Sequence, residues 1–286
     1  MANLVFLAVL FAALCHAGWN ALVKVGLDPL STTTLIAIGS GVVSLAVLPF
    51  TGAPATASWP WLIASVFIHL AYFAALIESY RTGDLGQVYP IARGSAPLMT
   101  AAATTFVVGE KLSLTGWAGI VALVAGVFLL SARGGRELAK IDHRAVGFAL
   151  LTALTICTYS VVDGIGARLA NEPGAYALAL FVGNALLLLP YALWRDGRAV
   201  IPAMRRFWRR GFAGGALQVA SYGTVLWAMT VAPIAIVATL RETSVLFGAL
   251  IAVVVLKEPL RATRIVAALL IVCGLVLIRL QAAGPP

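Results

Sequence analysis

Charged residues are scarce in this chain: only 11% of its 286 residues are Asp, Glu, Lys or Arg, whereas 61% are hydrophobic. The mean hydropathy of +0.98 is far above that of a soluble globular domain, in which about a quarter of the residues are charged. The shortage of charge excludes an ordinary soluble fold and indicates a polytopic membrane protein.

Cysteine and catalytic motifs are also in short supply. Cys15, Cys157 and Cys273 all fall within apolar runs without ligand spacing, so we interpret them as packing residues rather than disulfide or metal partners. There is no HExxH, no GxSG loop and no phosphate-binding glycine loop, and Thr82-Gly83-Asp84 follows Arg81 where an intramembrane aspartyl protease needs glycine. We therefore predict no catalytic residues, no metal, no cofactor and no ATP-driven activity.

Long apolar runs take up most of the chain. A bilayer core about 30 Å thick needs roughly 20 apolar residues in a helix, and the runs lack the period-two alternation of barrel strands. No Lys or Arg precedes Lys24, so we expect the first span to be an uncleaved helix. On this basis the chain is predicted to be all-α, with ten spans near residues 3–23, 32–50, 60–80, 85–108, 115–132, 145–167, 174–194, 211–230, 233–256 and 262–280.

The 20 Lys and Arg residues are very unevenly distributed. Fifteen lie in the loops after spans 1, 3, 5, 7 and 9, whereas the opposite side has only Lys111, Arg168 and Arg279. The positive-inside bias makes the fifteen-charge side cytoplasmic and places both termini outside. Topology thus explains the net charge of +9 without a nucleic-acid partner, and we expect loop 195–210 to lie against anionic lipid headgroups.

The second half of the chain repeats the first. Residues 84–130 align with 232–278 without a gap, which matches Arg93 with Arg241 and Glu110 with Glu258. Five spans per half is an odd number, so the second half enters the membrane from the other side. The sequence predicts two inverted five-helix repeats around a central cavity, at residues 1–132 and 145–286, joined by a cytoplasmic linker at 133–144.

Spans 5 and 10 have small residues at helical spacing, including Gly126 and Gly274, and no interior charge. Small residues allow helices to approach closely, so we assign these spans to packing, either within one chain or across a homodimer. Span 4 contains Pro90 and Pro97, which predict a kink or break near Arg93. This could be a flexible gate wall or a static kink.

The two arginines inside spans are the leading site candidates, because a buried charge costs free energy and calls for a role. Arg93 lies about 12 Å from the cytoplasmic end of its span, at 1.5 Å per residue, and Arg241 lies similarly far from the outer end. We therefore expect one guanidinium near each mouth of the cavity, binding a carboxylate, phosphonate or phosphate. The alternative is structural pairing, of Arg93 with Glu78 and of Arg241 with Glu242 or Asp163.

Other polar groups inside the spans complete the predicted site. Glu242 could bind a proton or a substrate ammonium, as could Asp163, whereas Glu78 lies near a span end and can reach water. The remaining candidates combine aromatic surface with polar atoms, as an amphipathic solute requires; they are His16, Trp19, Asn20, Tyr89, Tyr159, Gln218 and Tyr222. His16 could equally make an ordinary interhelical hydrogen bond.

Several segments resemble one known family. HAGWNALVK, YRTGDLGQVYPIARG, LWAMTVAPIAIVATLRETSV and the paired GEKLS and KEPLR turns are similar to the drug/metabolite transporter superfamily, in particular its bacterial EamA-type members. The resemblance implies a ten-helix basket in the bacterial inner membrane, with spans 5 and 10 peripheral. It also implies secondary transport of small organic metabolites, often amino acids moving outward.

We therefore predict an exporter of a small zwitterionic or anionic metabolite that works by alternating access, with a proton as a possible second partner. A lipid head-group flippase or membrane enzyme is an alternative in which the arginines bind phosphate. A carrier of choline-like cations or drugs is disfavoured by the arginines, although Trp19, Tyr222 and Trp227 offer aromatic faces. A purely structural subunit would have both arginines fully paired.

Overall fold

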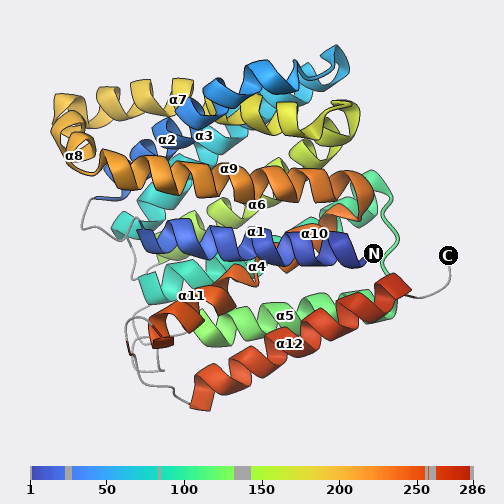
Figure 1. Cartoon of the computed structure of the whole chain (residues 1–286). Helices are drawn as coiled ribbons and strands as arrows, with labels where there is room; N and C mark the ends of the chain where they lie inside the picture. Colours follow the sequence, from blue (N-terminus) through green and yellow to red (C-terminus); the bar gives the residue numbers. More distant parts are fainter. Residues whose placement is uncertain are drawn as a thin grey trace.

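The chain folds into a bundle of helices in the computed structural model, which describes residues 2–22, 28–82, 85–131, 143–254, 257 and 262–283 (Figure 1). No strand occurs in these ranges. The helices are α1 (Asn3–Leu22), α2 (Pro29–Thr51), α3 (Trp59–Thr82), α4 (Leu85–Ala103), α5 (Leu114–Ser131), α6 (His143–Leu169), α7 (Pro173–Asp196), α8 (Val200–Arg206), α9 (Trp208–Val231), α10 (Ile234–Arg241), α11 (Ser244–Val254) and α12 (Ala262–Ala283).

The all-helical, membrane-spanning fold class predicted from the sequence is confirmed. Among the described residues, seven helical stretches are long and apolar enough to cross a membrane, and α5 is a shorter apolar helix. The spans begin and end near the expected residues, because local signals set their limits. At the start of α2, for example, the Asp28 carboxylate accepts the Ser31 N–H at 3.0 Å and Pro29 opens the helix.

Of the kink or break predicted for span 4, the break does not occur. Helix α4 runs without interruption through Pro90 and Pro97 and passes into the π-helical turn η2 (Thr104–Val108). The break occurs instead in span 9, between α10 and α11, although the equivalent positions in that span are Ala238 and Val245 rather than proline.

Backbone hydrogen bonds of shorter range mark the break in span 9. The amides of Glu242 and Thr243 donate to carbonyls three residues back, Thr239 and Leu240, at 3.0 and 3.1 Å. The Thr239 and Thr243 hydroxyls also donate to the Ala235 and Leu240 carbonyls, at 2.8 Å each. The turn directs Glu242 into the protein interior, where it is 1% exposed.

Several helix contacts correspond between the two halves of the chain. Contacts between α1 and α9 correspond to contacts between α6 and α3, and those between α2 and α9 correspond to those between α7 and α3. The α2–α7 and α5–α12 contacts each join a helix to its counterpart in the other half. These pairs correspond on exchange of the halves, whereas the α4–α5 contact has no counterpart of similar extent between α11 and α12 among the described residues.

Helices α5 and α12 pack closely on each other within the same chain. A side chain at Gly126 would lie 2.8 Å from the Ala267 carbonyl oxygen, and one at Gly274 would lie 2.7 Å from that of Gly119. The small residues predicted to mediate packing thus serve an intrachain contact. The outer face of α12 remains exposed at residues such as Leu269 and Val276, and a homodimer through this pair of helices stays a prediction.

Different helices lie at the two ends of the bundle. Figure 1 shows the beginning of α1 and the end of α12 at the same end of the bundle, with α8 at the opposite end. Fully buried apolar side chains from α5, α9 and α10 belong to one hydrophobic cluster, among them Leu123, Met229, Ile234 and Leu240. The polar residues discussed below lie within this apolar surround.

Candidate functional site

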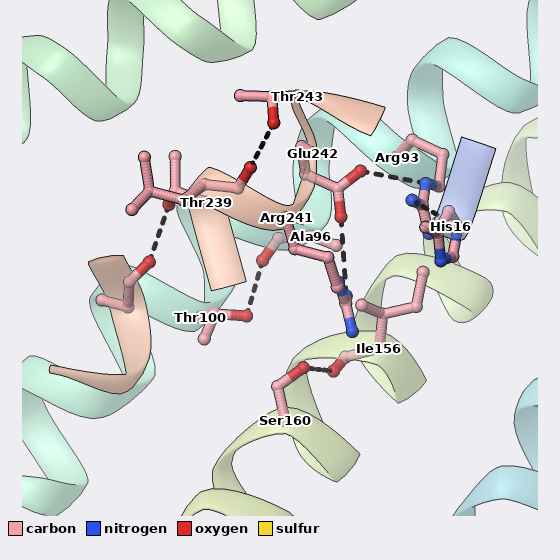
Figure 2. A network of polar contacts seen from close by, with 12 residues as sticks. His16, Arg93, Ala96, Thr100, Ile156, Ser160, Thr239, Arg241, Glu242 and Thr243 are labelled. Atoms are coloured by element: carbon pink, nitrogen blue, oxygen red, sulfur yellow. Dashed lines mark hydrogen bonds and ion pairs between the residues drawn. The ribbon is translucent and has the colours of Figure 1, made fainter. Parts of the chain in front are cut away.

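Arg93, Arg241 and Glu242 meet in the interior of the protein. The Arg93 Nε lies 3.0 Å from Glu242 Oε2, and the Arg241 Nη2 lies 3.5 Å from Glu242 Oε1. Figure 2 shows the Glu242 carboxylate between the two guanidinium groups. The expectation of one arginine near each mouth is therefore wrong, because both bind the same carboxylate.

His16 is the fourth member of this central charge cluster, which we define as His16, Arg93, Arg241 and Glu242 (Figure 2). The Arg93 Nη2 donates to His16 Nε2 at 3.2 Å. A guanidinium can only donate, so this nitrogen of His16 must accept, which requires a neutral ring protonated at Nδ1. The cluster therefore has two positive charges and one negative charge.

The duplication is asymmetric at the cluster. Glu242 aligns with Gly94 in the first half, so only the second half supplies a carboxylate beside its arginine. A side chain at Gly94 would overlap the Phe128 ring, whose nearest atom would be 2.3 Å away. One glutamate is thus shared by two arginines, and one unit of buried positive charge is not balanced within the cluster.

Arg241 has spare hydrogen-bonding capacity. Its guanidinium carbon lies 5.9 Å from the centre of the Tyr159 ring and 5.8 Å from that of Tyr222, within cation–π range. The side chain is almost completely buried, yet its Nε has no hydrogen-bond partner in the described structure, and the ion-paired Arg93 Nε and Glu242 Oε2 lack hydrogen-bonding geometry as well. Buried polar atoms nearly always have partners, so an unpaired donor here marks a place for a ligand atom or water.

A second polar group lies next to the first. The Asp163 carboxylate accepts the Tyr222 hydroxyl at 2.6 Å and the Tyr176 hydroxyl at 3.0 Å, and the Ser65 side chain also lies against it. His69 completes this Asp163 cluster, which we define as Ser65, His69, Asp163, Tyr176 and Tyr222. Because the Tyr222 ring also faces Arg241, the two clusters are neighbours.

Four aromatic rings surround this junction. His69 stacks on Tyr159 with 4.2 Å between ring centres, and Tyr72 meets the Tyr159 ring edge-on at 5.5 Å. Tyr222 lies 6.1 Å from Tyr159. The sequence interpretation did not include Tyr72, His69 or Tyr176 in the site. His69 and Tyr72 are three residues apart and hence on one helix face, which is the signal that could have identified them.

Two other predicted site residues border the central charge cluster, and a third lies on the same helix as Tyr222. Tyr89 contacts Arg93, and the Trp19 ring meets His16 edge-on at 5.1 Å. Gln218 lies one turn before Tyr222 on α9. The Trp19 Nε1 and Gln218 Oε1 atoms are both buried and have no hydrogen-bond partner in the part of the chain that the structure describes.

Two predicted residues lie apart from both clusters. Glu78 pairs with Arg195 and Arg81 at the end of α3, and not with Arg93. Asn20 is exposed and donates to the His16 carbonyl of its own helix. Asp84, Glu258 and most of the linker 133–144 lie outside the described residues.

Glu110, matched with Glu258 by the duplication, joins three helices at the end of the bundle where α10 begins. Its carboxylate accepts the N–H groups of Ile234 and Ala235 at 2.7 and 3.2 Å. Arg168 from α6 pairs with the same carboxylate at 3.0 Å. Arg168 also donates to the Met229 and Ala232 carbonyls at 2.9 and 3.2 Å, which fixes the corner between α9 and α10.

The sequence of the chain matches the model of the EamA-like transporter family twice, over residues 3–132 and 143–280. The chain belongs to this family. EamA-like proteins are part of the drug/metabolite transporter superfamily, as the motif resemblance predicted. The family assignment makes this chain a multi-pass membrane protein of a transporter family, and it gives no solute.

The chain matches about three fifths of the length of two curated relatives. The chain is 35% identical over 68 residues to the spermidine export protein MdtI of Klebsiella pneumoniae subsp. pneumoniae and to that of Klebsiella pneumoniae strain 342. The match covers 24% of this EamA-like chain and 62% of each relative's length. A crystal structure of another protein superposes with a TM-score of 0.80 over 98% of this chain and 97% of that one, at 19% identity, which shows a shared fold.

Proposed function

We propose that this EamA-like protein is a secondary transporter, facilitative or active, that exports a small zwitterionic or anionic metabolite such as an amino acid. The exchange of access between the two membrane faces would follow from the inverted halves. Arg241 and Arg93 bind the acidic group of the solute. Tyr159, Tyr222 and Trp19 provide aromatic surface for its apolar part.

The observation that carries this proposal is the sharing of Glu242 by two arginines. A surplus positive charge in a low-dielectric interior favours an anion, and Arg241 offers a buried donor without a partner. A solute carboxylate bound there would balance the surplus positive charge and accept a hydrogen bond from Arg241. A purely structural role is less well supported, because it predicts full pairing of both guanidinium groups.

A cationic solute is the main rival. The curated relatives export spermidine, a polyamine, and the Asp163 carboxylate beside three tyrosine rings has the features that bind ammonium groups. The charge of the neighbouring cluster opposes this solute, because Arg241 lies against the same Tyr222 ring. Transport of amino acids and of spermidine therefore distinguishes the two proposals.

Counterflow into proteoliposomes tests the proposal directly. Vesicles containing the purified protein are loaded with each unlabelled L-amino acid, or with spermidine, and uptake of the labelled compound is measured. We expect counterflow of at least one amino acid and none of spermidine. Arg93→Gln and Arg241→Gln should each slow it about 10- to 100-fold, because a hydrogen bond to a charged group contributes about 1.5–3 kcal/mol.

Arg198→Gln is the matched control, since Arg198 is exposed in the turn after α7 and should be replaceable without loss of counterflow. Counterflow of spermidine alone, or normal amino-acid counterflow in both variants of the cluster arginines, would refute the proposed binding role.

The orientation of the chain is part of the proposal. We propose that the protein lies in a bacterial inner membrane with both termini outside, because fifteen of the 20 Lys and Arg residues lie in loops on the other side. Alkaline phosphatase, which is active only outside the cytoplasm, should be active when fused after residue 283. An inactive fusion that is nonetheless produced in full length would contradict this orientation.

A further inference from the structure

We infer that Asp163 is the residue at which this transporter binds and releases a proton, in linkage with binding of the solute at the arginines. The inference rests on the proposed transport function. It adds the group through which a proton gradient would act on the solute.

Three other acidic side chains already have positively charged partners. Glu242 lies between two arginines, and Glu78 pairs with Arg195 and Arg81. Glu110 pairs with Arg168 and accepts two backbone N–H groups. A proton on any of these carboxylates would break ion pairs. Asp163, in contrast, is completely buried and makes no ion pair within the described ranges.

The partners of Asp163 suit both of its protonation states. A guanidinium only donates, so it cannot accept a proton from a neutral carboxylic acid. The hydroxyls of Tyr176, Tyr222 and Ser65 both donate and accept. They donate to the carboxylate, and one of them can turn to accept the O–H when the acid is neutral. Asp163 can therefore bind and release the proton without leaving a buried polar atom unpaired.

The charged and titratable groups around α6 link this proton to the solute. They are His69 from α3, Arg93 from α4, Tyr176 from α7, Tyr222 from α9, Arg241 from α10 and Tyr159 on α6 itself. The η1 turn (Thr56–Ser58), which also packs on α6, adds no titratable group. His69 donates from Nδ1 to the Ser65 carbonyl at 3.0 Å, and its ring is stacked on Tyr159.

Tyr222 connects Asp163 to the surplus positive charge of the central charge cluster, because its hydroxyl donates to Asp163 and its ring faces the Arg241 guanidinium. A solute carboxylate that binds Arg241 neutralises this charge and so favours a proton on Asp163. Linkage is reciprocal, so a proton on Asp163 strengthens binding of the carboxylate by the same factor. Solute and proton then cross together, and a large cytoplasmic pool of the solute drives both outward.

Infrared spectroscopy of the reconstituted protein tests the proton site without any solute. As the pH is lowered, the wild-type protein should gain a C=O band of a buried carboxylic acid. Asp163→Asn should lack this band, whereas Glu78→Gln, the matched acid-to-amide control, should keep it. A titrating band that persists in Asp163→Asn would overturn the assignment, and this result does not depend on the transported solute.

Transport separates this inference from the proposed function. For the L-amino acid with the fastest wild-type counterflow, an acidic exterior should drive accumulation in vesicles. Asp163→Asn should lose the accumulation yet retain counterflow, since exchange needs no net proton movement and shows that the variant is folded. Accumulation by Asp163→Asn, or accumulation by the wild type only with an alkaline exterior, would refute the linkage. Absence of wild-type counterflow would instead count against the proposed function.

Discussion

Glu242→Gln is expected to lower the free energy of unfolding by about 3–5 kcal/mol, the cost of removing one partner from a buried ion pair. The amide leaves Arg93 and Arg241 facing each other with no negative charge between them. Both side chains are almost fully buried, so water cannot hydrate either charge. Equilibrium unfolding in mixed micelles, followed by tryptophan fluorescence, measures the change.

The arginine variants provide the matched comparison. Arg93→Gln and Arg241→Gln each leave one cation and one anion, so their buried charge is balanced and the loss of stability should be smaller. Arg93→Gln combined with Glu242→Gln should be more stable than Glu242→Gln alone, because one of the two opposed charges is gone. Equal destabilisation by all three single variants would mean that charge balance does not determine the stability of this cluster.

The limits of the spans could be predicted from the sequence because they depend on local composition. Apolar length alone separates spans from loops, and residues such as Asp28 and Pro29 mark the ends. The position of the helix break could not be read in the same way. Proline was the visible signal, but the helix interrupted in the structure has none at the break, where threonine hydroxyls and an inward-facing glutamate occur instead.

The prediction that the two arginines lie apart failed for a geometric reason. Each was placed about 12 Å from its own face of a core about 30 Å thick, which leaves only about 6 Å between them in depth. The side chains of Arg93 and Arg241 are long enough to span this distance and contact the Glu242 carboxylate between them. The same estimate, applied to two inverted halves, is therefore compatible with the contact of both arginines with one carboxylate.

Pairings between distant helices were harder to predict. The contact of Tyr222 with Asp163 depends on how α9 packs on α6, which no pattern within either span specifies. The sequence identified both residues as polar groups of a possible site, but it gave no register between the helices. Hydrogen-bond partners at this level follow from tertiary packing and not from spacing along one helix.

Glu110→Ala is expected to lower the free energy of unfolding by about 2–4 kcal/mol, because hydrogen bonds to charged groups contribute about 1.5–3 kcal/mol each and water replaces part of them. The change removes the acceptor of two N–H groups at the start of α10 and leaves Arg168 without its carboxylate. Since α10 also carries Arg241 at its other end, counterflow should fall together with stability. Unfolding in micelles and counterflow in vesicles measure the two effects.

Glu172→Ala is the matched control for this prediction. Glu172 also precedes a helix, α7, but its side chain is exposed and makes no capping hydrogen bond. Its replacement should change the stability by less than about 0.5 kcal/mol, as is usual for surface substitutions. If Glu110→Ala were as mild as Glu172→Ala, the contacts of Glu110 with α10 and Arg168 would contribute nothing measurable. A large loss confined to Glu110→Ala would show that a single carboxylate stabilises the corner between α9 and α10, and with it the position of Arg241.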